Sequence, residues 1–223
     1  MLMVLDIVCV THATSLDNEA GVASGQTDPG LSRLGMRQAA ELSARFAGER
    51  FDLVVCSDLR RSWQTATIGF RGRLDIVREG RLREVDYGTL ARHPTAAIDA
   101  VRLDHVEIPF PQGESWHAAV TRHGDLLADL AAGQSRVLVI GHRATYVALQ
   151  HLCAGIPLAE AVADPRPWQP RWDYAFDGGA APWRAAGGCR GNDALSQRSV
   201  ACGVRRRMKR RFGRAESAIA FSM

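Results

Sequence analysis

Three short segments of the chain are almost continuously apolar and rich in β-branched residues: residues 4–10, 53–56 and 136–140. Such segments are typical of buried strands in a parallel sheet, which is covered on both faces. Longer segments between them carry apolar residues at helical spacing. This alternation predicts an α/β fold, a three-layer sandwich with a mostly parallel central sheet and helices on both faces.

Apolar periodicity predicts three helices, and a fourth helix is expected to begin near Ser57. The first ends at about Gly48 and the second near Gly133, because glycine is a common stop signal; the third follows His142. The residues expected to face the core are Leu31, Leu34, Leu42 and Phe46 in the first helix, Trp116, Val120, Leu127 and Leu130 in the second, and Tyr146, Leu149 and Cys153 in the third.

Each predicted strand leads directly into polar residues. His12 follows the first strand, Ser57 and Arg60 follow the second, and His142 follows the third. The ligand site of an open α/β sheet lies beyond the carboxyl ends of its strands, so these side chains should converge. A single histidine at a strand end is usually structural, but two histidines with an arginine favour a site. An arginine in the first turn of a helix suits a phosphate group, which predicts a phosphate site.

Six motifs in this chain occur in one order over residues 4–152. They are Thr11-His12-Ala13 with Asn18, the helix entry at residues 28–40, the segment 51–66, Leu82-Arg83-Glu84 with Tyr87-Gly88, Gly113-Glu114-Ser115 with Arg122, and Ile140-Gly141-His142. Together they resemble the histidine phosphatase superfamily, which includes the cofactor-dependent phosphoglycerate mutases. The resemblance implies the phosphoglycerate mutase-like version of the predicted fold, over residues 1–176.

The resemblance also implies a mechanism. His12 attacks phosphorus and forms a covalent phosphohistidine, which divides one displacement into two steps. Arg60 and His142 hold the equatorial phosphate oxygens, where negative charge is spread in the transition state. Glu84 protonates the leaving alkoxide and then takes a proton from the attacking water. No metal or organic cofactor is implied.

Further phosphate contacts are expected from Ser15, Asn18 and Ser57. Glu79 and Asp86 flank the predicted acid, and either would take its role if the loop were shifted. The remaining histidines lack the spacing of metal ligands and are expected on the surface or in helix packing: His93, His105, His117, His123 and His151. The five cysteines show no paired spacing, which favours free thiols in a reducing compartment.

The chain departs from the family pattern beside the nucleophile, where Thr11 stands in place of arginine and Ala13 in place of glycine. Thr11 can donate one neutral hydrogen bond to phosphate but carries no charge. Two interpretations follow. In the first, Arg143 restores the missing charge; this interpretation is ruled out if Arg143→Ala leaves turnover unchanged. In the second, the protein binds phosphorylated ligands without efficient turnover. Retention of the other matching residues favours activity.

The net charge of +4 is unevenly distributed. Residues 178–223 contain ten Lys or Arg and two acidic residues, so this segment carries +8 and the preceding body −4. We expect residues 177–223 to be a disordered, Gly- and Arg-rich basic tail, which either contacts nucleic acid or has no function. Loss of activity or folding on deletion of residues 178–223 would show that the tail is required.

The expected function is hydrolysis of a small phosphate ester in the cytoplasm. The first ten residues lack the features of a signal peptide, and no apolar stretch is long enough to span a membrane. Only about 25 residues separate Tyr87 from Gly113, which leaves no room for a large lid and favours a phosphatase over a mutase. Phe110 and Trp116 are expected to wall the leaving-group side.

The alternatives are a mutase, a noncatalytic phosphate-ester sensor and a nucleic-acid binder acting through the tail. No membrane partner is expected, and the chain should be a monomer or a homodimer.

Overall fold

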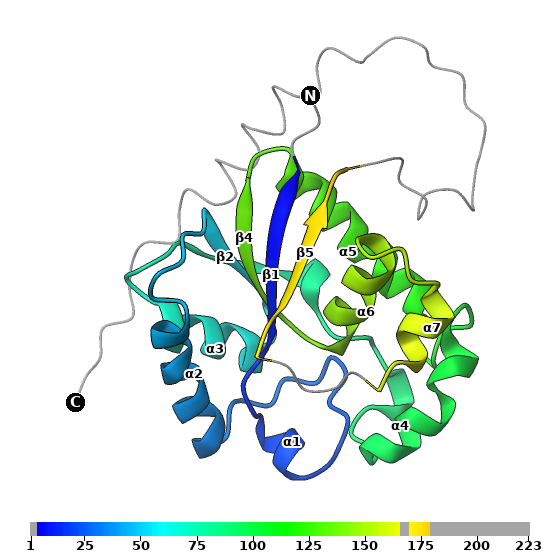
Figure 1. Ribbon diagram of the computed structural model, residues 1–223. Helices are drawn as coiled ribbons and strands as arrows, with labels where there is room; N and C mark the ends of the chain where they lie inside the picture. Colours follow the sequence, from blue (N-terminus) through cyan, green and yellow to red (C-terminus); the bar gives the residue numbers. More distant parts are fainter. Residues whose placement is uncertain (1–3, 166–169, 179–223) are drawn as a thin grey trace, which may run out of the picture. The chain divides into compact units, whose positions relative to one another are not determined.

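A computed structural model describes residues 4–165 and 170–178. Its centre is a five-stranded sheet with the order β3-β2-β4-β1-β5 (Figure 1). The strands are β1 (Leu5–Thr11), β2 (Leu53–Ser57), β3 (Ile76–Glu79), β4 (Arg136–Gly141) and β5 (Trp172–Phe176). β1 to β4 run parallel, and β5 is an antiparallel edge strand paired with β1. The predicted mostly parallel sheet is therefore confirmed.

Helices cover both faces of the sheet, as predicted. α2 packs on α3 and α5 on α6, and the two pairs lie on opposite sides of the strands (Figure 1). The helices are α1 (Leu16–Glu19), α2 (Arg33–Arg45), α3 (Arg60–Phe70), α4 (Thr95–Val101), α5 (Trp116–Ala131), α6 (Arg143–Leu152) and α7 (Leu158–Ala163). Short 3₁₀ turns span Gly80–Leu82, Gly88–Leu90 and Arg102–His105.

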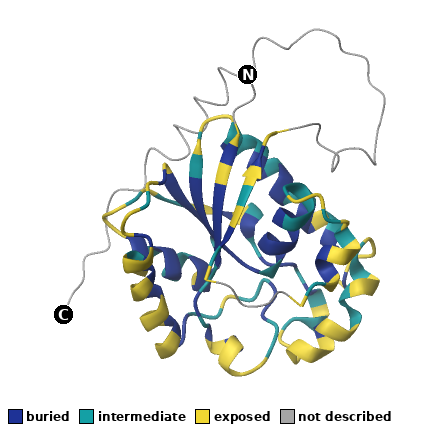
Figure 2. Cartoon of the chain, viewed as in Figure 1, coloured by how far each residue is buried: buried dark blue, intermediate teal, exposed yellow. Residues whose placement is uncertain are grey.

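The central strands are buried on both faces (Figure 2). Val8 and Val10 of β1 pack with Leu42 and Phe46 on the side of α2 and α3. The alternate residues, such as Ile7 and Cys9, are equally buried, since successive side chains of a strand point to opposite faces. Burial on both faces explains why these strands are almost continuously apolar.

The buried face of α2 differs from the one predicted. Leu34 is 42 % exposed, whereas Gly35 faces inward. A Cβ at position 35 would lie 2.0 Å from the carbonyl oxygen of Thr14, so α2 approaches the segment after β1 too closely for any side chain. By contrast, the predicted inward residues of α5 are all buried, and so are Tyr146 and Leu149 of α6.

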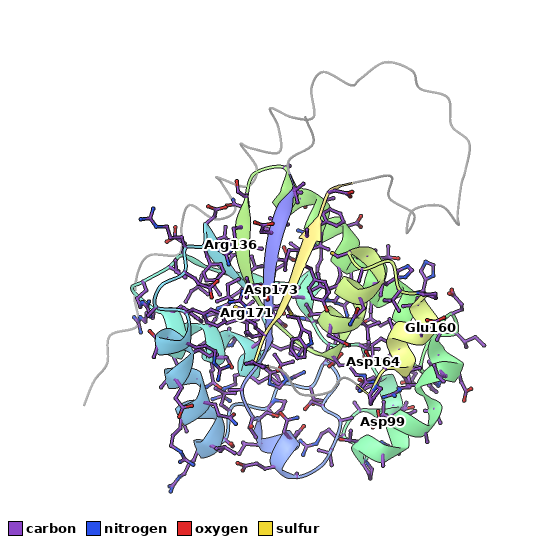
Figure 3. The ribbon with its side chains drawn as sticks, in the orientation of Figure 1. Asp99, Arg136, Glu160, Asp164, Arg171 and Asp173 are labelled. Carbon is purple, nitrogen blue, oxygen red and sulfur yellow. The ribbon has the colours of Figure 1, made fainter. Side chains whose placement is uncertain are left out.

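Ion pairs anchor the edge strand β5. Arg171, just before β5, pairs with Asp173 and with Glu49 (Figure 3). Arg136 of β4 binds the same Glu49 carboxylate at 2.6 Å. The shared carboxylate therefore ties the start of β5 to the start of β4.

Most of the predicted basic tail lies outside the described residues, which end at Gly178. The same holds for Cys189 and Cys202, whereas Cys9, Cys56 and Cys153 form no disulfide among the described residues. In the described part of the chain, no helix has the length and apolar character needed to cross a membrane.

Candidate active site

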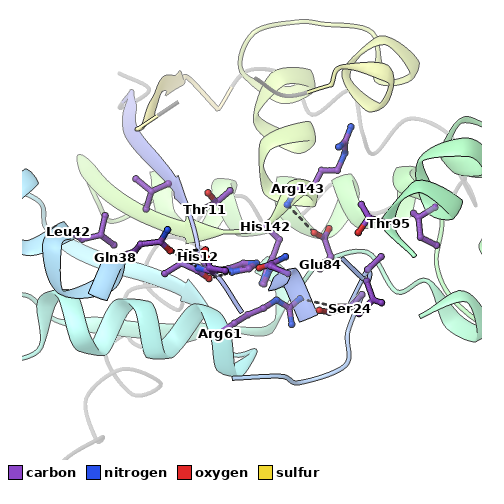
Figure 4. Close-up of a pocket in the computed structure, with 18 of the residues that line it drawn as sticks. Thr11, His12, Ser24, Gln38, Leu42, Arg61, Glu84, Thr95, His142 and Arg143 are labelled. Atoms are coloured by element: carbon purple, nitrogen blue, oxygen red, sulfur yellow. Dashed lines mark hydrogen bonds between the residues drawn. The ribbon is translucent and has the colours of Figure 1, made fainter. Parts of the chain in front are cut away.

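A pocket of about 530 Å³ opens beyond the carboxyl ends of the parallel strands (Figure 4). Six of the residues predicted from the sequence line it: Thr11, His12, Asn18, Glu84, His142 and Arg143. Ser15, Ser57 and Arg60 are not among its lining residues. The convergence of β1, β4 and their following turns therefore produces most of the expected cluster.

His12 is held at the end of β1 by the backbone. Its N–H donates to the carbonyl of Gly141 at 3.0 Å, which continues the β1–β4 pairing by one residue. The ring atom Nδ1 lies 2.8 Å from the carbonyl oxygen of Ala13. A carbonyl only accepts, so Nδ1 carries the proton of the neutral ring and Nε2 keeps its lone pair. This tautomer is the one that a nucleophile at Nε2 requires.

His142 lies between β4 and α6, and its ring centroid is 5.0 Å from that of His12. The side chain is 1 % exposed, and neither ring nitrogen has a partner among the described residues. Burial, followed by the charge of Arg61, holds the pKa of His142 well below its usual value of 6.5. A neutral ring can still donate one N–H to an anion in the pocket.

Glu84 connects the loop after β3 to the start of α6. Its carboxylate accepts backbone N–H groups from Arg143 at 3.0 Å and Ala144 at 2.9 Å, and a third from Val85 at 2.9 Å. A carboxylate is favoured at a helix N-terminus because unpaired N–H groups and the positive end of the helix dipole meet there. The contact fixes Glu84 beside His142 (Figure 4).

An ion pair on α5 holds the backbone of the same loop. Arg122 donates to the Glu84 carbonyl at 3.1 Å and pairs with Glu114 at 2.7 Å. Glu114 in turn accepts the Asp86 N–H at 3.0 Å. The two alternative acids are outside the pocket, since Glu79 pairs with Arg81 and the Asp86 carboxylate accepts the Gly88 N–H.

The structure places Arg61 in the pocket lining and leaves out Arg60, the arginine predicted to bind phosphate. Arg60 is exposed and lies outside the pocket lining, and its backbone N–H donates to Asp28. Arg61 is 1 % exposed and lines the pocket, where its guanidinium donates to the carbonyls of Gly25 at 2.8 Å and Thr27 at 2.9 Å. The shift arises because α3 begins at Arg60 rather than near Ser57.

The helical periodicity of α3 contains a signal for Arg61. Arg61 and Thr65 are one turn apart, and both are fully buried; the Thr65 hydroxyl donates to the Arg61 carbonyl at 2.7 Å. The buried face of α3 therefore includes position 61, whereas position 60 is rotated about 100° away from it.

Two predicted phosphate ligands have structural roles instead. Ser15 is fully buried as the N-cap of α1, where its hydroxyl accepts the Asn18 N–H at 3.2 Å. Ser57 is also fully buried, and its hydroxyl accepts the Leu59 N–H at 3.2 Å in the turn before α3. Both hydroxyls serve helix starts, for which serine is a preferred residue.

The Arg143 guanidinium points away from His12 and Arg61 (Figure 4). It donates to the carbonyls of Asp164 at 2.6 Å and Val162 at 3.3 Å, at the end of α7. One of its nitrogens also lies 4.0 Å from Asp99 of α4. In this conformation Arg143 does not take the place of an arginine at position 11, and its backbone N–H donates to the Glu84 carboxylate.

The wall on the leaving-group side also differs from the prediction. Phe110 and Trp116 are almost completely buried and do not line the pocket. Instead, the pocket is bounded there by the loop after α1 and by α4, with Val22, Thr95 and Ile98 among the lining residues. Within residues 4–165 and 170–178, no group of three or more His, Cys, Asp or Glu side chains is arranged to hold a metal ion.

Comparison with known proteins identifies the family. Residues 7–164 match the model of the histidine phosphatase superfamily (branch 1). A protein named probable phosphoglycerate mutase from Proteus mirabilis is 30 % identical over 164 residues, covering 69 % of this chain and 76 % of that protein. Phosphoserine phosphatase 1 of Hydrogenobacter thermophilus is 29 % identical over 159 residues, covering 64 % and 75 %.

Among solved structures, a mycobacterial glucosyl-3-phosphoglycerate phosphatase in complex with VO₃ is similar to this chain. It has a TM-score of 0.64 and 28 % sequence identity, covering 71 % of this chain and 86 % of that one. This similarity confirms the phosphoglycerate mutase-like α/β fold. The family match spans the strands and helices that build the pocket, and we conclude that the chain belongs to the histidine phosphatase superfamily.

Proposed function

We propose that the protein is a phosphomonoesterase that hydrolyses a small phosphorylated metabolite through a phosphohistidine at His12. The observation that carries this proposal is the geometry around His12. Its Nδ1–H is directed to the Ala13 carbonyl, so Nε2 has a lone pair, and the ring faces His142 across 5.0 Å. Arg61 and Glu84 line the same pocket and supply a cation and a proton-transfer group.

In the first step, Nε2 of His12 attacks phosphorus and the bond to the ester oxygen breaks. The Arg61 guanidinium and a His142 N–H bind the equatorial oxygens, where charge accumulates. Glu84, in its acid form, gives its proton to the departing alkoxide. Thr11 and Asn18 line the pocket and donate further hydrogen bonds to the phosphoryl group.

In the second step, water attacks the phosphohistidine and Glu84 takes the water's proton. The P–N bond breaks, inorganic phosphate leaves and neutral His12 is restored. The two steps together consume one water and release one alcohol, so Glu84 ends in the acid form in which it began. The names of the relatives supply a first substrate set, namely phosphoserine, phosphoglycerate and glucosyl-3-phosphoglycerate.

The charges of the pocket favour a second candidate, a phosphate-ester sensor with little turnover. Three basic and three acidic side chains line it, Arg45, Arg61 and Arg143 against Glu41, Glu84 and Asp99. A dianionic phosphate would therefore meet little net positive charge. Saturable binding of phosphate esters with negligible hydrolysis would favour the sensor.

The experiment is p-nitrophenyl phosphate hydrolysis between pH 5 and 8 without added metal, with wild type beside His12→Ala. His117→Ala is the matched control, because His117 contacts Glu107 at the start of α5 and does not line the pocket. We expect turnover in wild type and in His117→Ala, and its loss in His12→Ala. Turnover that persists in His12→Ala would refute the phosphohistidine route.

A further inference from the structure

The deeply buried His123 is not used by the proposed mechanism. It lies on the inner face of α5, 2 % exposed. Its Nδ1 is 2.7 Å from the carbonyl oxygen of Ala119, and its Nε2 is 3.2 Å from the hydroxyl of Thr145 on α6. A buried imidazole with two defined partners joins α5 to the helix that begins beside His142.

The direction of these hydrogen bonds follows from their chemistry. The Ala119 carbonyl can only accept, so Nδ1 of His123 carries the ring proton and Nε2 must accept. The Thr145 hydroxyl is therefore the donor to Nε2. Burial, followed by the charge of Arg122, lowers the pKa of His123 to about 3, so the ring stays neutral and this direction holds at physiological pH.

Thr145 passes the interaction on to the active site. Its hydroxyl oxygen accepts the backbone N–H of His142 at 3.2 Å. Thr145 is 1 % exposed and is tightly packed against β4, since a Cβ at position 141 would lie only 2.2 Å from its hydroxyl oxygen. The hydroxyl is thus fixed between the His142 backbone and the His123 ring.

His142 depends on this support because its own ring has no hydrogen bond among the described residues. Its orientation therefore depends on the backbone and on the packing around the ring. We propose that His123 and Thr145 are positioning residues that hold His142 in place against the phosphoryl group, an inference that rests on the proposed function of the pocket. The hydrogen bonds run in one direction, from the His142 N–H to Thr145, from Thr145 to His123, and from His123 to the Ala119 carbonyl.

Paired variants of Thr145 test the proposal. Thr145→Val keeps the shape of the side chain and removes the hydroxyl, whereas Thr145→Ser keeps the hydroxyl. A small displacement of a group that contacts the transition state is costly, so we expect Thr145→Val to lower kcat for p-nitrophenyl phosphate by about tenfold or more, with little change in KM. Thr145→Ser should restore most of the rate. The matched control is Thr121→Val on α5, whose hydroxyl donates to the His117 carbonyl away from the pocket.

Variants of His123 supply the second half of the test. His123→Leu should reproduce the loss of kcat, and His123→Gln, which offers an acceptor oxygen to Thr145, should recover it. The double variant Thr145→Val/His123→Leu should be no slower than either single variant, because each substitution interrupts the same series of hydrogen bonds. Wild-type kcat in Thr145→Val, or full additivity in the double variant, would overturn the proposal.

Two measurements separate this proposal from the proposed function. Orthovanadate, a mimic of five-coordinate phosphorus, should bind about tenfold more weakly to Thr145→Val than to wild type, whether or not the protein turns over a substrate. An unchanged vanadate affinity overturns the positioning role. In the wild-type protein, ¹⁵N NMR should show the Nδ1–H tautomer of His123; an Nε2–H tautomer would also overturn it.

Discussion

Arg61 joins two parts of the site through one guanidinium. It lines the pocket beside His12 and donates to the carbonyls of Gly25 and Thr27, so the loop before α2 is fixed by the same group that faces the pocket. Lysine at this position would keep the charge but lose the planar fork. Both the charge and the geometry of Arg61 should therefore matter.

Replacing Arg61 and its neighbour gives a matched pair of variants. Removing one preorganised group from a transition-state clamp typically costs about a hundredfold or more in rate, which we expect for Arg61→Ala, with a smaller loss for Arg61→Lys. Arg60→Ala should stay within about twofold of wild type, since surface changes away from the site have small effects. The measurement is kcat/KM for p-nitrophenyl phosphate. A greater loss in Arg60→Ala than in Arg61→Ala would show that the assignment to Arg61 is wrong.

Thr11 is the residue at which added charge should help. It lines the pocket at the end of β1, next to His12, where the balance of basic and acidic side chains is even. A guanidinium there would add one cation to the phosphate clamp. We expect Thr11→Arg to raise kcat/KM for a dianionic monoester by about tenfold or more. Thr11→Gln, of similar polarity without the charge, is the control, and an equal gain in both variants would contradict the electrostatic explanation.

The N-terminus of α6 holds the carboxylate of Glu84, the proposed acid. It presents the N–H groups of Arg143 and Ala144 to the Glu84 carboxylate, while His142 precedes its first residue. One helix start therefore positions both His142, a proposed phosphate-binding residue, and the proposed acid. Glu84→Gln can keep part of this hydrogen bonding but cannot transfer a proton.

The effect of Glu84→Gln should depend on the leaving group. An alkyl phosphate such as phosphoserine needs a proton on the departing oxygen, so its turnover should fall by about a hundredfold or more. p-Nitrophenolate leaves readily without protonation, so the formation of phosphohistidine from p-nitrophenyl phosphate should be affected much less. Burst kinetics with the two substrates measure the difference. Equal losses of phosphorylation rate would rule out Glu84 as the general acid.

Strands and helices with a clear apolar pattern in their own segment could be predicted from the sequence. Those that form through contacts with residues far away in the chain could not. β1, β2 and β4 are central strands whose burial on both faces gives a continuous apolar run, and the polar residues at their ends follow from parallel topology. β5 is recruited by antiparallel pairing to β1, and two of its five residues are exposed. α4 and α7 have only 7 and 6 residues, too few to show a period.

The residues of the candidate site were also predictable only where the signal lay in their own segment of the sequence. His12 and His142 were predictable because each directly follows a strand. Arg61 was missed because its direction depends on where α3 begins, and a change of one residue rotates a side chain by about 100°. The role of His123 was out of reach, since it depends on the packing of α5 against α6.

Two buried histidines couple the stability of the whole molecule to pH. Burial is the largest cause that lowers the pKa of His123, to about 3, and that holds the pKa of His142 well below 6.5. Between the folded and unfolded pKa values the unfolded chain binds more protons, so acidification favours unfolding. The two neutral histidines therefore contribute to the stability of the folded protein above about pH 6.5, and this contribution is lost as the pH falls below 6.5. The lowered pKa of Asp58 acts in the same direction, but only at more acidic pH, below its ordinary value of 3.8.

The contribution of His123 to this pH dependence of stability can be measured by substitution. The pKa of His123 is about 3 in the folded chain and 6.5 in the unfolded chain. Protonation of His123 in the unfolded chain should therefore lower the free energy of unfolding by about 2 kcal/mol between pH 7 and pH 5. His123→Gln has no proton to take up, so urea denaturation should show a correspondingly smaller loss over the same interval. His93→Gln, at an exposed position, is the matched control. If His123→Gln lost as much stability on acidification as wild type, the folded protein would take up a proton at His123 over the same pH range as the unfolded chain, and the buried neutral ring would be refuted.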